Sequence, residues 1–316
     1  MPEPLVSILV PCYNAAPFLA ETLECALAQT WPHVEIIVVD DGSRDASRAI
    51  AQSFGARGVK LFTQPNSGAS AARNHAFRVS RGDFIQYLDA DDLISPGKIA
   101  AQMALLARCP VGALATCAWG RFYRDPQEAR FLDALVCRDF TGVEFLVLAG
   151  DTGTMMHPSA WLVPRHVIAC AGPWDERLTL NDDGEFFSRV VLAASGMQFC
   201  GDPAAKSYYR SGLTGSLSKQ RHDAARRSQY LSLDLLTTAL LRAEDSPRTR
   251  RAAAGYWRRY VHEFFPSPPE LVNRAEAAVQ QLGEDLGPPV LGRKSALLAN
   301  FIGWRNVARL KYLLGQ

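Results

Sequence analysis

The sequence lacks the features that mark a membrane-spanning, zinc-binding or disulfide-stabilised protein. Its longest apolar stretches, such as Val111–Trp119, are far shorter than the roughly 20 residues that a transmembrane helix needs. Its seven cysteines include no Cys-x-x-Cys pair and its six histidines no His-x-x-x-His cluster. The start, Met-Pro-Glu-Pro, has no basic leader. We therefore expect a cytoplasmic protein with free thiols.

The net charge is small and unevenly divided. It is +2 overall, which argues against a nucleic-acid-binding protein. Residues 221–316 hold 15 basic and 9 acidic side chains, whereas residues 1–220 hold 19 and 23. An anionic nucleotide bound to the acidic part would need a cation to mediate.

The hydrophobic pattern changes near residue 220. Residues 5–93 alternate short apolar runs with helical patterns, which predicts an α/β fold with a parallel sheet flanked by helices. We expect strands over Val6–Val10, Val34–Val39, Val59–Phe62 and Asp83–Leu88, separated by helices over 18–27, 45–54 and 69–79. The Leu-, Ala- and Arg-rich remainder predicts helices over 222–243, 248–264, 270–282 and 294–314. This gives one domain over 1–220 and a helical region over 221–316.

Two strand ends carry candidate binding residues at the edge where open α/β sheets bind ligands. The first strand leads into Pro11-Cys-Tyr13-Asn14, a set suited to a planar base, although a plain turn with an Asn cap explains it equally well. The second leads into Asp40-Asp41-Gly-Ser. One of these acids can accept a hydrogen bond from a uracil or thymine N–H, or the pair can simply cap a helix. Alternation along the strand allows only one of them to reach a ligand.

Two further segments carry charge. A turn at Gly68 leads into a small-residue helix that holds Arg73, which suits a phosphate or is a surface charge. The fourth strand leads into Asp89-Ala-Asp91-Asp92. Two carboxylates separated by one residue offer the partial oxygen shell that Mg²⁺ or Mn²⁺ takes, and a solvated acidic turn is the alternative.

The sequence resembles glycosyltransferase family 2 through four motifs that occur in this order: Pro-x-Tyr-Asn, Val-Val-Asp-Asp-Gly-Ser, Asn-x-Gly-x-x-x-Ala-Arg-Asn and Asp-x-Asp-Asp. The likeness is close over residues 5 to about 95 and loose to about 210. It implies the GT-A fold, a mostly parallel twisted sheet flanked by helices, here with a C-terminal helical appendage. It also implies an inverting transferase that uses a nucleotide sugar, usually a UDP sugar, with Mn²⁺ or Mg²⁺. Residues 1–95 would form the nucleotide-binding half and 96–220 the acceptor half of the catalytic domain.

The resemblance also assigns roles by position. The residues that it places in the nucleotide site are Pro11, Tyr13, Asn14, Asp41, Gly68, Arg73 and Asp89. Tyr13 would stack on the base, Asp41 would accept from the base N3–H, and Arg73 would lie near the diphosphate. Asp91, together with Asp89, would bind the metal.

A later acidic pair completes the pattern. In this family such a pair heads a helix, and Asn181-Asp182-Asp183-Gly-Glu-Phe-Phe-Ser-Arg matches it after Gly172-Pro-Trp-Asp-Glu. The resemblance makes Asp183 the general base, with Asp182 as the second candidate. A helix N-terminus favours the ionised carboxylate that a base must be, and simple capping is the alternative.

The roles of two histidines are left open. Many relatives carry a late histidine after a Tyr-Tyr-Arg strand, but here Tyr208-Tyr-Arg210 is followed by Ser-Gly, and His222 lies further downstream. His157 lies where the acceptor side of such sites is built, although a lone histidine is more often structural.

The C-terminal pattern and the expected partners complete the interpretation. Residues 296–311 mix apolar and basic residues at helical spacing, which suits packing on the catalytic domain, a dimer contact, or an anionic inner membrane surface near a lipid-linked acceptor. We expect a nucleotide-sugar donor and a glycan, lipid-linked or protein acceptor, and no nucleic acid. The alternatives are a non-catalytic nucleotide-sugar-binding protein and a nucleotidyltransferase of the same fold. The latter should have a Gly-rich basic loop after the first strand, which is absent.

Overall fold

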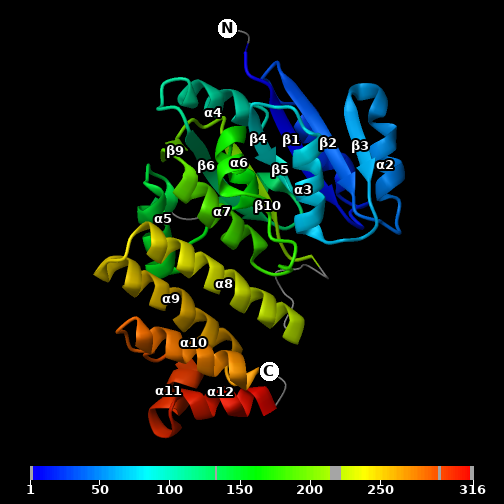
Figure 1. Cartoon of the computed structure of the whole chain (residues 1–316). Helices are drawn as coiled ribbons and strands as arrows, with labels where there is room; N and C mark the ends of the chain where they lie inside the picture. Colours follow the sequence, from blue (N-terminus) through cyan, green and yellow to red (C-terminus); the bar gives the residue numbers. More distant parts are fainter. Residues whose placement is uncertain (1–2, 132–133, 214–221, 291–292, 314–316) are drawn as a thin grey trace.

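The computed structural model (Figure 1) describes residues 3–131, 134–213, 222–290 and 293–313. The first sheet has the strand order β3-β2-β1-β4-β8, in which β1 to β4 are parallel and β8 is antiparallel. Its strands are β1 (Val6–Cys12), β2 (Val34–Asp40), β3 (Val59–Thr63), β4 (Phe84–Tyr87) and β8 (Val163–Pro164). The helices between the parallel strands are α1 (Leu19–Leu27), α2 (Ser47–Ser53) and α3 (Ala69–Val79). The predicted parallel sheet with flanking helices is confirmed.

A second sheet continues the domain in the order β5-β10-β6-β7, with β9 paired to β6. Its strands are β5 (Leu93–Ile94), β6 (Ala113–Phe122), β7 (Arg130–Phe131), β9 (Gly196–Cys200) and β10 (Lys206–Arg210). The helices of this part are α4 (Lys98–Leu106), α5 (Gly142–Thr152), α6 (Arg165–Ala171) and α7 (Asp182–Ala193). Short 3₁₀ turns lie at Gly55–Arg57, Pro126–Glu128, Ala134–Val136 and Pro158–Ala160.

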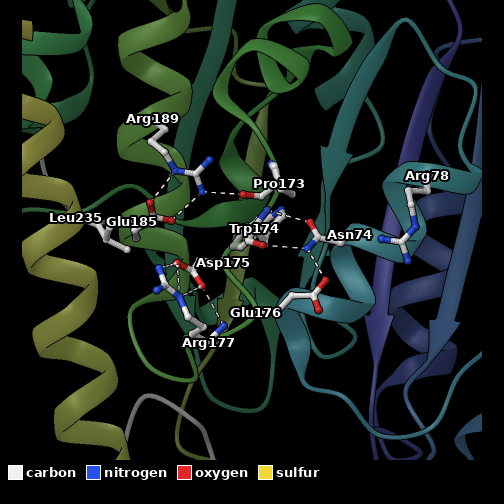
Figure 2. Close-up of a pocket in the computed structure, with 10 residues that line it drawn as sticks. All are labelled: Asn74, Arg78, Pro173, Trp174, Asp175, Glu176, Arg177, Glu185, Arg189 and Leu235. Atoms are coloured by element: carbon white, nitrogen blue, oxygen red, sulfur yellow. Dashed lines mark hydrogen bonds and ion pairs between the residues drawn. The ribbon is translucent and has the colours of Figure 1, made fainter.

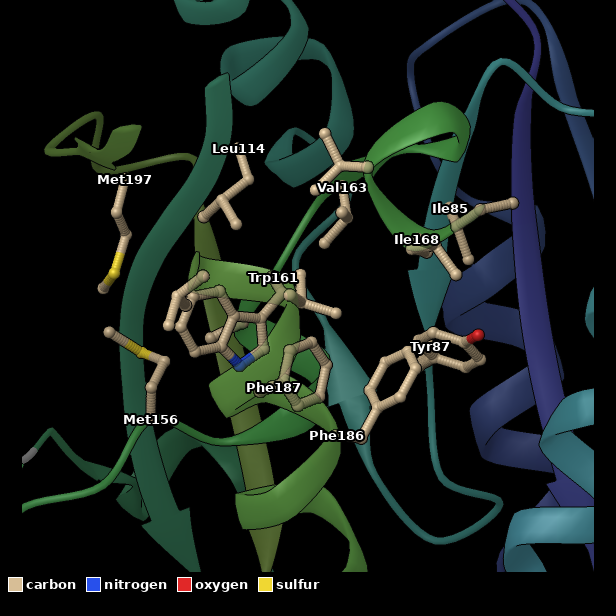
Figure 3. Close-up of a cluster of buried hydrophobic side chains, with 14 of the residues drawn as sticks. Ile85, Tyr87, Leu114, Met156, Trp161, Val163, Ile168, Phe186, Phe187 and Met197 are labelled. Atoms are coloured by element: carbon tan, nitrogen blue, oxygen red, sulfur yellow. The ribbon is translucent and has the colours of Figure 1, made fainter. Parts of the chain in front are cut away.

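The first sheet is buried on both faces, which explains its continuous apolar strands. Alternate residues of one strand belong to different cores: Leu9 of β1 packs in one apolar cluster, and Val6, Ile8 and Val10 pack in the other. The first cluster fills the space between β4 and α7 with aromatic rings, as Figure 3 shows. Within it, Tyr87 meets Phe186 edge to face at a centroid distance of 5.7 Å. This packing fixes α7 against the carboxyl ends of the strands.

The C-terminal region is helical, as expected. Its helices are α8 (Asp223–Ala243), α9 (Pro247–Phe264), α10 (Pro269–Gln281), α11 (Arg293–Ile302) and α12 (Trp304–Leu313). Helix α8 packs on α7, and α9 packs on α5. The α5–α9 crossing is close enough that a Cβ at Gly255 would collide with the carbonyl oxygen of Gly150, so glycine is needed there. The region is therefore joined to the α/β domain through α8 and α9.

The prediction of a single helix over 294–314 is wrong in one respect, because this segment forms two helices. It breaks at Gly303, whose φ of 78° is left-handed, and so forms α11 and α12. Trp304 packs edge to face on His262 and Phe265, and Arg305 pairs with Glu276. Helix α12 therefore packs on α9 and α10, whereas packing on the catalytic domain was one of the alternatives expected. Within the described ranges, no helix combines the length and apolar character needed to cross a membrane.

Candidate functional site

The loop after β1 presents an aromatic ring. Tyr13 is 48% exposed, whereas Pro11 lies within the strand. Asn14 adopts a left-handed φ of 50°, donates its backbone N–H to Ser43 Oγ at 3.0 Å, and accepts from the Arg44 N–H at 2.8 Å through its side-chain oxygen. The Asn14 amide therefore ties the loop after β1 to the loop after β2, and this leaves the Tyr13 ring at the surface.

The loop after β2 carries a buried carboxylate that organises the loop between β3 and α3. Asp41 Oδ1 accepts from Gln64 Nε2 at 2.8 Å and from the Ser67 N–H at 2.9 Å, and its Oδ2 accepts from the Gly68 N–H at 2.9 Å. The neighbouring Asp40 instead accepts from the Ser43 N–H at 3.3 Å. The two acids thus hold different loops, as alternation predicts. Asp41 fixes the turn that starts α3.

Arg73 joins three segments that are far apart in the sequence. Its side chain is 7% exposed, and its two terminal nitrogens lie 2.7 Å from Asp182 Oδ2 and 2.9 Å from Asp89 Oδ1. Ser70 Oγ also donates to Asp182, at 3.2 Å. Burial would lower the pKa of Arg73, but Asp89 and Asp182 raise it above its ordinary value. The structure therefore brings predicted residues of α3, the loop after β4 and the start of α7 into one charged cluster.

A buried tryptophan supports this guanidinium. The Arg73 guanidinium carbon lies 4.4 Å from the centroid of the Trp174 ring. Figure 2 shows how Asn74 holds Trp174: its amide donates to the Trp174 carbonyl and to Glu176 Oε1, both at 2.9 Å, and accepts from the Trp174 N–H at 2.9 Å. Asn74, Trp174 and Glu176 line an open cavity of about 610 Å³. Sequence reasoning missed the role of Trp174, although its segment was recognised.

The acids after β4 lie at two depths. Burial, and then repulsion by Asp89, raise the pKa of Asp91 to about 6. Asp92 lies deeper, with Oδ1 accepting from the Arg210 N–H at 2.8 Å and Oδ2 3.2 Å from His157 Nε2. Burial also lowers the pKa of His157 to about 4. His157 is thus a buried partner of Asp92, and this pair was not predicted.

These acids fit a divalent cation. Among the described residues, ligand atoms of Asp89, Asp92 and His157 all lie within 4.8 Å of one another. Asp91, which was predicted as a ligand beside Asp89, is outside that group but reaches the partly exposed surface. Carboxylate oxygens are the donors that Mg²⁺ and Mn²⁺ prefer, and the burial and neighbouring Asp89 that raise the pKa of Asp91 disfavour its charge, a cost that a cation would offset.

Two adjacent acids at the start of α7 face different surroundings. Asp182 is bound to Arg73, whereas Asp183 lines a cavity of about 460 Å³ between α5, α7, α8 and α9. Asp183 Oδ1 accepts from the Gly184 N–H at 2.9 Å. Burial, and then repulsion by Asp182, raise the pKa of Asp183 to about 6. An ionised but basic carboxylate therefore lies beside the charged cluster.

The downstream histidine, His222, caps a helix. His222 precedes α8, and its Nδ1 accepts from the Ala225 N–H at 3.2 Å. The segment 214–221, where a late ligand was sought, lies outside the described residues.

Comparison with known sequences agrees with these observations. Residues 7–162 match the glycosyl transferase family 2. An "Uncharacterized glycosyltransferase" of Rickettsia bellii (strain RML369-C) is 30% identical over 199 residues, which cover 61% of this chain and 28% of the relative. One of Rickettsia typhi is 29% identical over 196 residues, 61% of this chain and 60% of the relative. The chain thus spans 28% and 60% of the length of these two relatives.

Solved structures resemble the whole fold. TarS residues 1–349 of S. aureus in complex with UDP-GlcNAc superimposes with a TM-score of 0.74 at 17% identity, covering 99% of this chain and 92% of that one. The mannosyltransferase PcManGT of Pyrobaculum calidifontis, in complex with GDP-Man and Mn²⁺, gives 0.55 at 19% identity, covering 99% and 88%. The expected GT-A fold with C-terminal helices is confirmed. The matched residues 7–162 identify this part of the chain, about half of its length, as a member of glycosyl transferase family 2.

Proposed function

We propose that the protein is an inverting glycosyltransferase, which moves a sugar from a nucleotide-diphosphate donor to a hydroxyl of a glycan, lipid-linked or protein acceptor. One observation carries this proposal: Arg73 binds Asp89 and Asp182 at the sheet edge, directly beside Asp183. The proposed site for the donor phosphates, at Arg73, therefore lies next to the proposed general base, Asp183. Solved relatives of the same fold hold UDP-GlcNAc or GDP-Man, which supports a nucleotide sugar, and we favour a UDP sugar.

The donor base would lie on the loops after β1 and β2. The exposed Tyr13 ring offers a stacking surface beside the Pro11 backbone. Asp41 already accepts three hydrogen bonds from residues 64–68, so a bond from the base N3–H would use the remaining lone pair of Oδ2. We therefore assign Asp41 first to shaping the Gly68 turn, and Asn14 to holding the loop that carries Tyr13.

The donor phosphates would lie against Arg73 and the acids after β4. Arg73 holds Asp89 in place and offsets its charge, so a phosphate would approach a cluster that is less negative than its acids alone. A Mg²⁺ or Mn²⁺ ion held by Asp89 and Asp91 would, when bound, stabilise negative charge on the leaving diphosphate.

The Asp183 carboxylate would remove the acceptor proton. Because it is not bonded to Arg73 and its pKa is about 6, it is ionised at neutral pH and still basic enough to accept a proton. A hydroxyl held at Asp183 attacks the anomeric carbon from the face opposite the diphosphate, and a single displacement inverts that centre.

We also propose a peripheral position on the inner face of the cell membrane. Exposed apolar side chains of α11 and α12 include Leu297, Phe301, Leu310 and Leu313, with Phe301 86% exposed. Residues 286–316 contain five basic and no acidic residues, which suits an anionic lipid surface. A lipid-linked acceptor would be met there.

A donor panel tests the proposed function. The full chain is mixed with UDP, GDP and dTDP sugars, with Mn²⁺ or with EDTA, and donor binding is followed by thermal shift and slow nucleotide release. We expect one nucleotide class to stabilise the protein only with the cation, because Asp89 and Asp91 need a bridge to the phosphates.

Two variants sharpen that panel. Asp91→Asn should lose the cation-dependent stabilisation, whereas Asp234→Asn, at an exposed acid of α8, should keep it. If no nucleotide sugar stabilises or is consumed by the wild-type protein, the proposed function is wrong.

A further inference from the structure

The cavity beside Asp183 is completed by the C-terminal helices. Its walls come from α5, α7, α8 and α9, and from residues 153–156 that follow α5. Gln229 of α8 and Tyr256 of α9 line it together with Asp183 of α7. Any molecule that reaches Asp183 through this cavity therefore touches residues beyond 221.

The walls of this cavity are mainly apolar. Met156, Trp161 and Phe187 form one side, where the Trp161 and Phe187 rings stack at a centroid distance of 4.8 Å (Figure 3). Leu233 and Leu236 of α8 line another part. Such surfaces bind apolar groups by removing them from water.

Several polar groups of the walls already have protein partners. The Tyr256 hydroxyl donates to the Leu146 carbonyl at 3.0 Å, and Ser188 Oγ donates to the Glu185 carbonyl at 2.6 Å. Arg259 donates to the Gly150 carbonyl at 2.7 Å and so faces the end of α5. The hydrogen bonds of these three groups are therefore made within the protein, and a molecule covered in hydroxyls would find few partners among them.

One buried donor in the wall has no partner. Trp161 is 2% exposed, and its indole N–H is among the buried groups that bond to no described residue. Buried N–H groups are normally satisfied, and this one leaves a hydrogen bond that a ligand oxygen would supply on displacing the atoms that now cover it.

We propose that this cavity is the acceptor site and that it takes an amphipathic acceptor, in which the reactive hydroxyl lies next to an apolar alkyl or aryl group. The apolar group packs against Trp161, Phe187 and Leu236, and one oxygen accepts from the Trp161 N–H. This inference rests on the proposed function, because it assumes that Asp183 is the base.

The transfer step balances at this site. The acceptor O–H proton moves to the Asp183 carboxylate as the acceptor oxygen forms a bond to the anomeric carbon. The bond between that carbon and the phosphate oxygen breaks, and its electron pair leaves with the nucleoside diphosphate. The hydroxyls of a fully hydroxylated glycan face would be bound less well, because the wall groups Tyr256, Ser188 and Arg259 already bond to the protein.

Two neutral probes test the class of acceptor. Octyl β-glucoside, below its micelle concentration, and methyl β-glucoside share the same sugar and differ in the apolar group. Calorimetry on the full chain should detect octyl glucoside binding at least tenfold tighter than methyl glucoside. With the donor present, octyl glucoside should also be the better acceptor, by a lower KM.

Variants place the binding in the cavity. Gln229→Trp should fill it and weaken octyl glucoside binding at least tenfold, while Thr238→Trp, at an exposed position of the same helix, should not. Trp161→Phe keeps an aromatic side chain, although a smaller one, and removes the N–H, so it should raise KM with little change in kcat. Retained thermal stabilisation by the donor shows that each variant is folded.

The outcomes separate this inference from the proposed function. If the two glucosides bind equally, or if Gln229→Trp binds octyl glucoside as the wild type does, the apolar acceptor site is wrong even though donor turnover stands. If the wild-type protein binds no donor at all, the proposed function fails first, and this inference fails with it.

Discussion

At the residue scale, the adjacent acids Asp182 and Asp183 have different surroundings and, we propose, different roles. Asp182 is held by Arg73 and Ser70, so its charge is offset and its position is fixed. Asp183 is turned to the cavity, and burial together with Asp182 raises its pKa to about 6. Successive residues of a helix point about 100° apart, which lets one pair of neighbours serve both sides of a site.

The pKa of Asp183 predicts how transfer depends on pH. A base must be ionised, so lowering the pH below about 6 protonates Asp183 and removes the active form. With saturating donor, we expect the transfer rate to be level above about pH 7 and to fall about tenfold per pH unit below pH 6. Initial rates in a constant-ionic-strength buffer series measure this, with donor-induced thermal shift at each pH as the control. A rate that stays level down to pH 5 would contradict the assignment.

At the element scale, the turn that begins α3 depends on a glycine. Gly68 has φ 93° and ψ 163°, a conformation that side chains strongly disfavour, and its N–H is held by Asp41. The turn places Arg73 one turn into the helix, within reach of Asp89 and Asp182. The backbone conformation at one position therefore sets the charged cluster.

Gly68→Ala should destabilise the protein, although its Cβ would meet no atom within 4 Å. The cost is backbone strain, which we expect to be about 1–3 kcal/mol in the free energy of unfolding. The matched control is Gly55→Ala, which also meets nothing within 4 Å but does not have a positive φ, and it should be neutral or slightly stabilising. Urea unfolding curves measure both. Equal stabilities for the two variants would show that the turn is not strained.

Patterns within one element could be predicted, whereas most contacts between distant elements could not. The four parallel strands follow from apolar runs that alternate between two cores, and the motif order places Arg73, Asp89 and Asp182 at one sheet edge. The Asp92–His157 pair joins residues 65 positions apart and depends on how the second sheet packs, which no local pattern encodes. The break at Gly303 was overlooked because the apolar spacing continues across it.

At the scale of the whole molecule, the C-terminal region contains two pairs of helices with different surroundings. Helices α8 and α9 close the cavity beside Asp183, whereas α11 and α12 lie at the end of the molecule farthest from β1 to β3 (Figure 1). The outer pair leaves apolar side chains exposed in a segment with only basic charges. The net charge of +2 thus conceals an acidic α/β part and a basic end.

The outer helices should bind anionic vesicles. We expect the full chain to sediment with phosphatidylglycerol vesicles and not with neutral phosphatidylcholine vesicles. It should dissociate from the anionic vesicles as the salt concentration rises, because salt screens exposed charges. Phe301→Asp should weaken binding at least tenfold, since it removes an inserted ring and adds a repelled charge. The control is Val111→Asp, at an exposed apolar residue before β6, which should leave binding unchanged. Equal binding to both kinds of vesicle would contradict this orientation.

The central claim is that Asp183 removes the acceptor proton beside a donor site that Arg73, Asp89 and Asp182 hold together. The most direct test compares wild-type protein and Asp183→Asn for donor binding and for transfer in the same samples. We predict unchanged donor-induced thermal stabilisation and a loss of transfer of about 10² to 10⁴-fold. Transfer by Asp183→Asn at the wild-type rate would contradict the account.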